Sequence, residues 1–169
     1  TEMGHVTEAF TRLALANPHV RFTLRHNDRT VYDVPADQDI PSRIGLFFGD
    51  DLARDLIEIE SGDGDVRLSG YVARPSQSRS HPRMQYLFLN GRFIRDRSLQ
   101  HALTEAYRGL LLTGRYPISF LRLDMPADAD AMTFVDVVFP GFLFIVGMSL
   151  PFAINSRLAK GSTLLQLQA

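Results

Sequence analysis

An apolar strand pattern, a tight turn and an amphipathic helix follow one another between residues 84 and 112, and this succession limits the chain to few folds. Met84–Asn90 has the nearly unbroken apolar character of a buried strand, and Asn90-Gly91 predicts a two-residue turn into a second strand. Apolar residues at helical spacing then predict a helix over 98–112. A helix that covers neighbouring strands is typical of an α/β sandwich, with helices on a mixed sheet.

Helical spacing and strand-like alternation of apolar residues also occur through the rest of residues 2–124. Further helices are predicted over 2–16, where Asn17-Pro18 follows, and from Pro41 to about Gly49. We expect Gly114 to end the helix over 98–112. Alternating apolar residues predict strands at 20–25, 30–34, 56–59, 66–72, 92–94 and 117–123.

Acidic and basic residues are segregated along the chain, although the formal net charge is only −1. Residues 28–65 contain eleven Asp and Glu against three Arg, whereas residues 67–115 contain nine Arg against two acidic residues. A strongly positive stretch predicts a surface that meets phosphate. The alternative is a solvated face in an arginine-rich protein, because 17 of the 18 basic residues are Arg.

Several kinds of chemistry are excluded by residue type. The chain has no cysteine, which excludes disulfides, thiolate catalysis and cysteine-based metal sites. Its five histidines are scattered singly without metal-ligand spacing, so we predict no metal site. Nucleophile-elbow, dinucleotide-binding and P-loop motifs are absent, and no self-contained active site or catalytic residue is predicted. The first ten residues lack the pattern of an export signal.

The most distinctive cluster of charge lies where the second strand runs into the long helix. Arg92, Arg95 and Arg97 occur within six residues, next to the expected helix start. Guanidinium groups suit phosphate contacts, and the backbone N–H groups of a helix N-terminus add to them. From the residues alone, the cluster predicts a polyanion site.

Three separated segments resemble the MutL family of DNA mismatch-repair proteins, and they occur in the family's order: RLALANPHVRFTLRHNDR, GYVARP and QYLFLNGRFIRDRSLQHALTEAYRGLL. The resemblance implies that residues 1–126 are the family's transducer domain, including the linking helix over 2–16. It also implies a fold shared with a ribosomal protein and with the second domain of gyrase-type ATPases.

The resemblance implies a role in DNA mismatch repair. In the family, this domain binds the DNA backbone and relays ATP-driven dimerisation from an ATPase domain that this chain lacks. Arg92, Arg95 and Arg97 match the arginines of the DNA groove, and Asn90 and Gly91 match the turn that aims them. The implied partners are DNA, a second copy of the full-length protein, and mismatch-recognition and other repair proteins of a nucleoid-associated cytoplasmic pathway. ATP and magnesium are implied only for the full-length protein.

The chain departs from the family after Pro126. The family's DVNVHPxK segment, whose lysine reaches ATP, is missing, and residues 137–156 contain no charge, which predicts a membrane-spanning segment. MTFVDVVFPGFLFIVGMSLPFAI resembles membrane helices of the heparan-α-glucosaminide N-acetyltransferase-like family, so 127–169 is predicted to be an apolar tail of unrelated origin. The alternatives are therefore a membrane-anchored acyltransferase-like fragment and an α/β interaction module without a DNA role.

Overall fold

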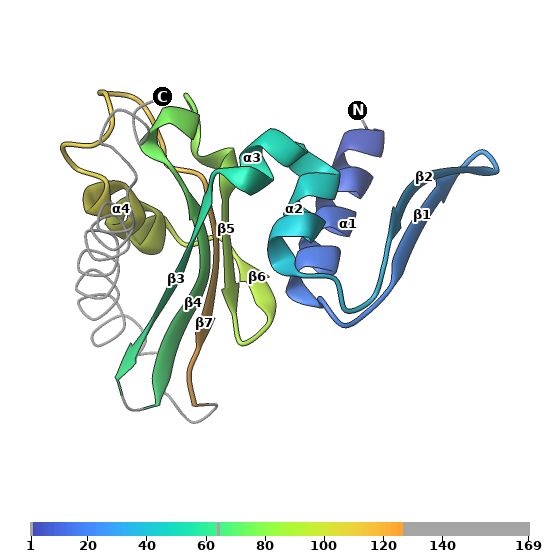
Figure 1. Cartoon of the computed structure of the whole chain (residues 1–169), viewed down its shortest axis with the longest axis horizontal. Helices are drawn as coiled ribbons and strands as arrows, with labels where there is room; N and C mark the ends of the chain where they lie inside the picture. Colours follow the sequence, from blue (N-terminus) through green and yellow to red (C-terminus); the bar gives the residue numbers. More distant parts are fainter. Residues whose placement is uncertain (1, 64, 127–169) are drawn as a thin grey trace.

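The centre of the molecule is a five-stranded sheet with helices on both faces (Figure 1). The computed structural model describes residues 2–63 and 65–126. The tail over 127–169, with its expected apolar segment at 137–156, lies outside the described residues. Among the residues that are described, no helix has both the length and the apolar character needed to cross a membrane.

The order of elements agrees with the sequence predictions over most of the chain. The helices are α1 (Glu2–Ala16), α2 (Ile40–Phe48), α3 (Asp50–Arg54) and α4 (Arg97–Ala106), with 3₁₀ turns η1 (Pro75–Gln77) and η2 (Pro82–Met84). The strands are β1 (Phe22–His26), β2 (Arg29–Val34), β3 (Leu56–Asp63), β4 (Val66–Ala73), β5 (Gln85–Leu89), β6 (Arg92–Ile94) and β7 (Ser119–Asp124).

The sheet has the order β3-β4-β7-β5-β6, and its strands are not all antiparallel. β5 and β7 are parallel neighbours, while the other pairs are antiparallel. Parallel neighbours need a crossover connection, and the segment from β6 through α4 supplies it. The predicted mixed sheet with packed helices is confirmed.

Each face of the sheet has its own apolar core. Leu121 and Leu123 of β7 pack with Leu99 and Leu103 of α4 on one face. Phe120, which precedes Leu121 on β7, lies on the opposite face and packs in the same core as Ile44 of α2. This alternation follows from the period of two along a strand, and it sorts charged residues between the faces in the same way.

Helix α4 ends earlier than the periodicity predicts. The prediction of a helix over 98–112 that stops at Gly114 is wrong, because the helix ends at Ala106. Tyr107 is buried, and its hydroxyl donates to the Ala73 carbonyl oxygen at 2.8 Å. Gly109 then adopts φ +81°, a conformation open to glycine, so the chain turns away before the apolar pattern ends.

Strands β1 and β2 form a separate hairpin that extends away from the main sheet (Figure 1). Rings of Phe10, Phe22, Tyr32 and Phe47 pack together, with centroids 5.3–6.1 Å apart, and join the hairpin to α1 and α2.

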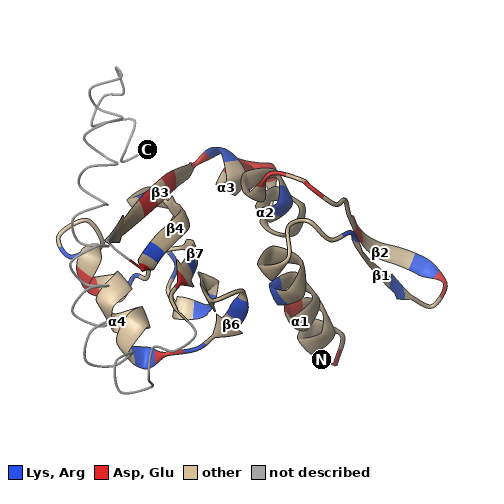
Figure 2. Cartoon of the chain, turned by 90° about the horizontal axis from the view of Figure 1, so that it is seen from below, with Lys and Arg blue, Asp and Glu red and all other residues tan. Residues whose placement is uncertain are grey.

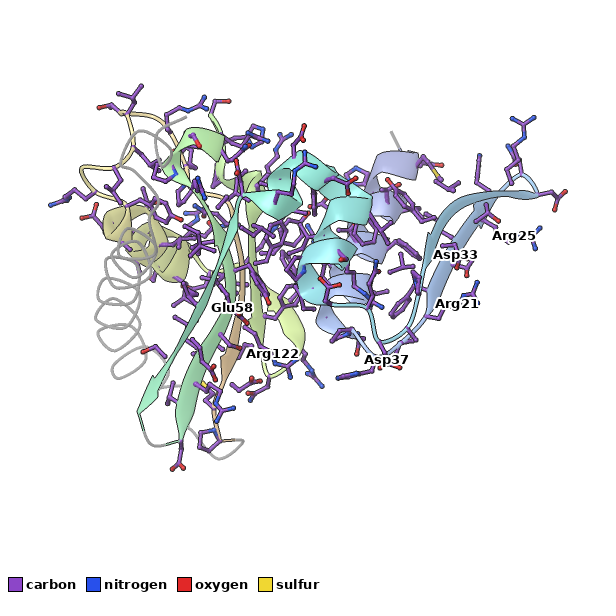
Figure 3. All side chains as sticks on the ribbon, viewed as in Figure 1. Arg21, Arg25, Asp33, Asp37, Glu58 and Arg122 are labelled. Carbon is purple, nitrogen blue, oxygen red and sulfur yellow. The ribbon has the colours of Figure 1, made fainter. Side chains whose placement is uncertain are left out.

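An exposed ion pair, Arg21 to Asp33 at 2.7 Å, links the residue before β1 to β2 (Figure 3). Its hydrogen bond lowers the pKa of the Asp33 carboxyl.

A buried arginine joins these elements. Arg43 of α2 has no exposed surface, and its guanidinium donates to backbone carbonyl oxygens at the C-terminal end of α1 and around the hairpin. The acceptors are Ala14 O at 2.7 Å, Asn17 O at 3.0 Å, Val20 O at 3.1 Å and Pro35 O. One side chain therefore holds four separate points of the backbone.

We predict that Arg43→Met lowers the free energy of unfolding by about 3 kcal/mol or more, because four carbonyl groups lose a charged donor. Urea unfolding of the chain measures this loss. Arg54→Met is the matched control, since Arg54 is exposed and pairs only with Asp51, and it should cost less than about 0.5 kcal/mol. Equal losses for the two variants would show that the Arg43 contacts do not support the fold.

Candidate nucleic-acid interface

The turn between β5 and β6 has the conformation that its sequence predicts. Asn90 and Gly91 have φ values of +46° and +77°, as the two central residues of a type I′ hairpin turn require. The Asn90 side-chain oxygen accepts from the Met125 N–H at 2.9 Å, and the Asn90 N–H donates to Leu123 O at 2.9 Å. The turn is thereby fixed to the end of β7.

Arg92 begins β6 and lies opposite Leu89 on the neighbouring strand. Residues opposite each other share a face of the sheet, so Arg92 is placed on the face that α4 covers. Its side chain is exposed, and it has no hydrogen bond or ion pair with the part of the chain that the structure describes. Its charge is available to an external partner.

Arg97 is the first residue of α4. The preceding residue, Asp96, caps the helix by accepting from the Leu99 N–H at 2.8 Å. A cation at a helix N-terminus faces the positive end of the helix dipole, so α4 gains no stability from Arg97. Within residues 2–63 and 65–126 its exposed guanidinium has no polar partner. Position and exposure both suit an external anion.

Arg95 differs from the other two arginines. Its Nη2 lies 2.9 Å from the Glu8 carboxylate of α1, with 64% of its side chain exposed. Figure 2 shows basic residues on β6 and at the start of α4, on the side of the sheet domain where these two elements meet. The structure therefore places Arg92 and Arg97 at the β6–α4 edge without side-chain partners among the described residues, whereas Arg95 is already paired with Glu8 of α1.

Further basic residues lie beside this edge, and sequence reasoning missed them. Arg12 of α1 pairs with Glu8 and lies over the Phe93 ring, with its Cζ 4.2 Å from the ring centroid. Arg122 of β7, labelled in Figure 3, lies next to the turn, and its Nη2 would be 3.9 Å from a Cβ at Gly91. In the sequence, the one indication of these residues is that Glu8 and Arg12 lie four residues apart in a predicted helix, which is the spacing of a helix ion pair.

No metal site is evident at this edge. In the portion of the chain with assigned positions, no group of three or more His, Asp or Glu side chains could hold a metal ion.

Comparison with known proteins identifies the family of the chain. Residues 44–132 match the family model described as "DNA mismatch repair protein, C-terminal domain", which is more than half of the chain. The chain belongs to this family. The MutL resemblance stated from the sequence is confirmed, while the resemblance of residues 131–160 to membrane acyltransferases stays a prediction outside the described residues.

Curated proteins named DNA mismatch repair protein MutL are similar to this chain in sequence. The chain is 39% identical over 128 residues to the DNA mismatch repair protein MutL of Geotalea uraniireducens, and 41% identical over 128 residues to that of Anaeromyxobacter dehalogenans. Each match covers 76% of this chain and 21% of the relative. The chain thus spans about a fifth of the length of the curated relatives it matches.

Solved structures share the fold at low sequence identity. The N-terminal domain of a DNA repair protein superposes with a TM-score of 0.74 and 17% identity, covering 93% of this chain and 53% of that one. The Aquifex aeolicus MutL ATPase domain with a K252N mutation gives a TM-score of 0.56 and 19% identity, covering 86% and 52%. At this level of sequence identity, the two structures confirm the α/β fold and show nothing about function.

The roles of Asn90 in the turn can be separated by two substitutions. Asn90→Gly keeps the left-handed backbone and loses only the hydrogen bond to Met125 N–H, at a cost of about 1 kcal/mol. Asn90→Ala also adds left-handed strain, so we predict a further loss of about 1 kcal/mol. Urea unfolding compares the two variants, and equal free energies would show that the backbone conformation at Asn90 is not a constraint.

Proposed function

We propose that this chain is the DNA-contacting part of a MutL-type mismatch-repair protein, and that Arg92 and Arg97 bind backbone phosphates without reading bases. The observation that carries the proposal is the pair of exposed guanidinium groups at the β6–α4 edge that lack polar partners within the described chain. Phosphate contacts fix a protein on DNA and are independent of sequence. Arg95 contributes when it leaves Glu8, and Asn90 and Gly91 hold the turn in place.

In this proposal the domain relays ATP-driven dimerisation, and the ATPase that generates the signal belongs to the longer protein. The family's ATP-contacting lysine has no counterpart near Pro126, because the only lysine in the chain is Lys160. The described residues also include no candidate magnesium site. Nucleotide binding, dimerisation and contacts with other repair proteins in the cytoplasm are assigned in this proposal to the full-length protein.

Charge reversal tests the proposed interface. We predict that Arg92→Glu with Arg97→Glu weakens DNA binding and makes the dependence of log K on log salt less steep by about 2, as expected for two lost phosphate contacts. Binding is measured by fluorescence anisotropy on short DNA at several salt concentrations.

The matched control is Arg29→Glu with Arg54→Glu, which changes the net charge equally at two exposed sites in the acidic stretch. If both double variants bind alike, general charge and not the β6–α4 edge determines affinity. Absence of any binding by the unmodified chain at low salt would favour the interaction module without a DNA role.

A further inference from the structure

A polar cleft of about 250 Å³ lies where α1 approaches β5, β6 and η2, and we refer to it as the α1–β6 cleft. Strand β6 pairs only with Leu87–Leu89, so the start of β5 at Gln85 extends beyond it at this edge of the sheet. The polar residues that line the cleft are Glu8, Arg12, Arg83, Gln85, Arg95 and Gln100.

The Gln85 side chain is the unusual feature of the cleft. Gln85 is only 4% exposed, and neither its amide nitrogen nor its amide oxygen has a hydrogen-bond partner among the described residues. Buried polar groups in proteins are almost always hydrogen-bonded to protein, ordered water or a ligand, so the Gln85 amide requires a partner from outside the described residues. Ser119, which lies opposite Gln85 on β7, also has a buried hydroxyl without a partner among the described residues.

The charge of the cleft selects the kind of ligand. Three arginines, Arg12, Arg83 and Arg95, line the cleft together with one carboxylate residue, Glu8. Glu8 accepts from Arg12 and Arg95, and Arg12 is also held over the Phe93 ring, so two of the cations are oriented in advance. Arg83 is exposed and has no polar partner in the part of the chain with assigned positions. Excess positive charge in a small space suits a compact oxyanion.

We propose that the α1–β6 cleft binds one phosphate group through the guanidinium groups of Arg83 and Arg95 and the side-chain amide nitrogen of Gln85. Bound phosphate competes with Glu8 for Arg95, which loosens the contact between α1 and β6. This inference rests on the proposed function only for the source of the phosphate. Gln100 lies one helical turn after Arg97, so a nucleic acid strand held by Arg97 passes close to the cleft.

Thermal unfolding of the full chain in inorganic phosphate, against chloride at equal ionic strength, tests the cleft. At phosphate about tenfold above its dissociation constant, we expect the Tm to rise by about 4 °C or more. Gln85→Met should raise the Tm without phosphate, because two unpartnered buried atoms are removed, and should abolish the phosphate-dependent rise. No rise in the unmodified chain, or an unchanged rise in Gln85→Met, overturns the proposal.

Gln38→Met is the matched control. Gln38 also has a buried side-chain oxygen without a partner, but it lies between β2 and α2 and does not line the cleft. We expect Gln38→Met to keep the full phosphate-dependent rise. Loss of the rise in this variant as well would overturn the assignment of the binding site to the cleft.

Anisotropy with single-stranded DNA identifies the source of the phosphate. If Gln85→Met weakens DNA binding severalfold and inorganic phosphate competes with DNA, the ligand is a phosphate of the strand. If Gln85→Met binds DNA normally but has lost the response to inorganic phosphate, the ligand is free phosphate and the strand assignment is overturned. A third outcome separates the two proposals. If Arg92→Glu with Arg97→Glu leaves DNA binding unchanged while phosphate still raises the Tm, the proposed function is overturned and the assignment of phosphate to the cleft is retained.

Discussion

The buried guanidinium of Arg43 determines how α1, α2 and the β1–β2 hairpin meet. Burial lowers the pKa of Arg43. Four backbone carbonyl oxygens accept from its two Nη atoms, while its Nε has no partner among the described residues. Ala14 O belongs to the last turn of α1, where the helix dipole is negative and favours a cation. The candidate nucleic-acid interface depends indirectly on the hydrogen bond from Arg43 to Ala14 O. This bond fixes α1, and α1 places Glu8 and Arg12 beside the edge of the sheet.

Local patterning was enough to predict most of the fold. The predicted helix over 2–16 matches α1, and the Asn90-Gly91 turn lies between β5 and β6 as expected, because each depends on residues that are neighbours in sequence. The end of α4 was predicted wrongly because it depends on a distant contact, the bond from the Tyr107 hydroxyl to Ala73 O across 34 residues. The burial of Arg43 was not predicted, because arginine is rarely fully buried and no local pattern marks an exception.

The sequence named three arginines for the candidate site, but it did not predict the face of the sheet or the partner of each one. Arg92, Arg95 and Arg97 are close in sequence, which favoured a single cluster. Strand register places Arg92 on the α4 face, while Glu8, 87 residues away, holds Arg95 toward α1. Gln85 lies within the predicted strand Met84–Asn90, and no role was predicted for its side chain. Only the tertiary structure reveals that its amide is buried without a partner.

The positive stretch over 67–115 contains two kinds of arginine, and the difference limits how strongly its charge can attract a polyanion. Arg79 and Arg115 donate to backbone oxygens around Ser78, and Arg108 pairs with Glu105, so their groups already have protein partners. Arg92 and Arg97 have none among the described residues. Affinity for DNA depends on the number of phosphates neutralised and not on net charge, so the salt dependence of binding should reflect the few unpaired arginines and not all nine. Part of the positive charge of the stretch is therefore already engaged within the protein, and phosphate binding by the unpaired arginines stays a prediction.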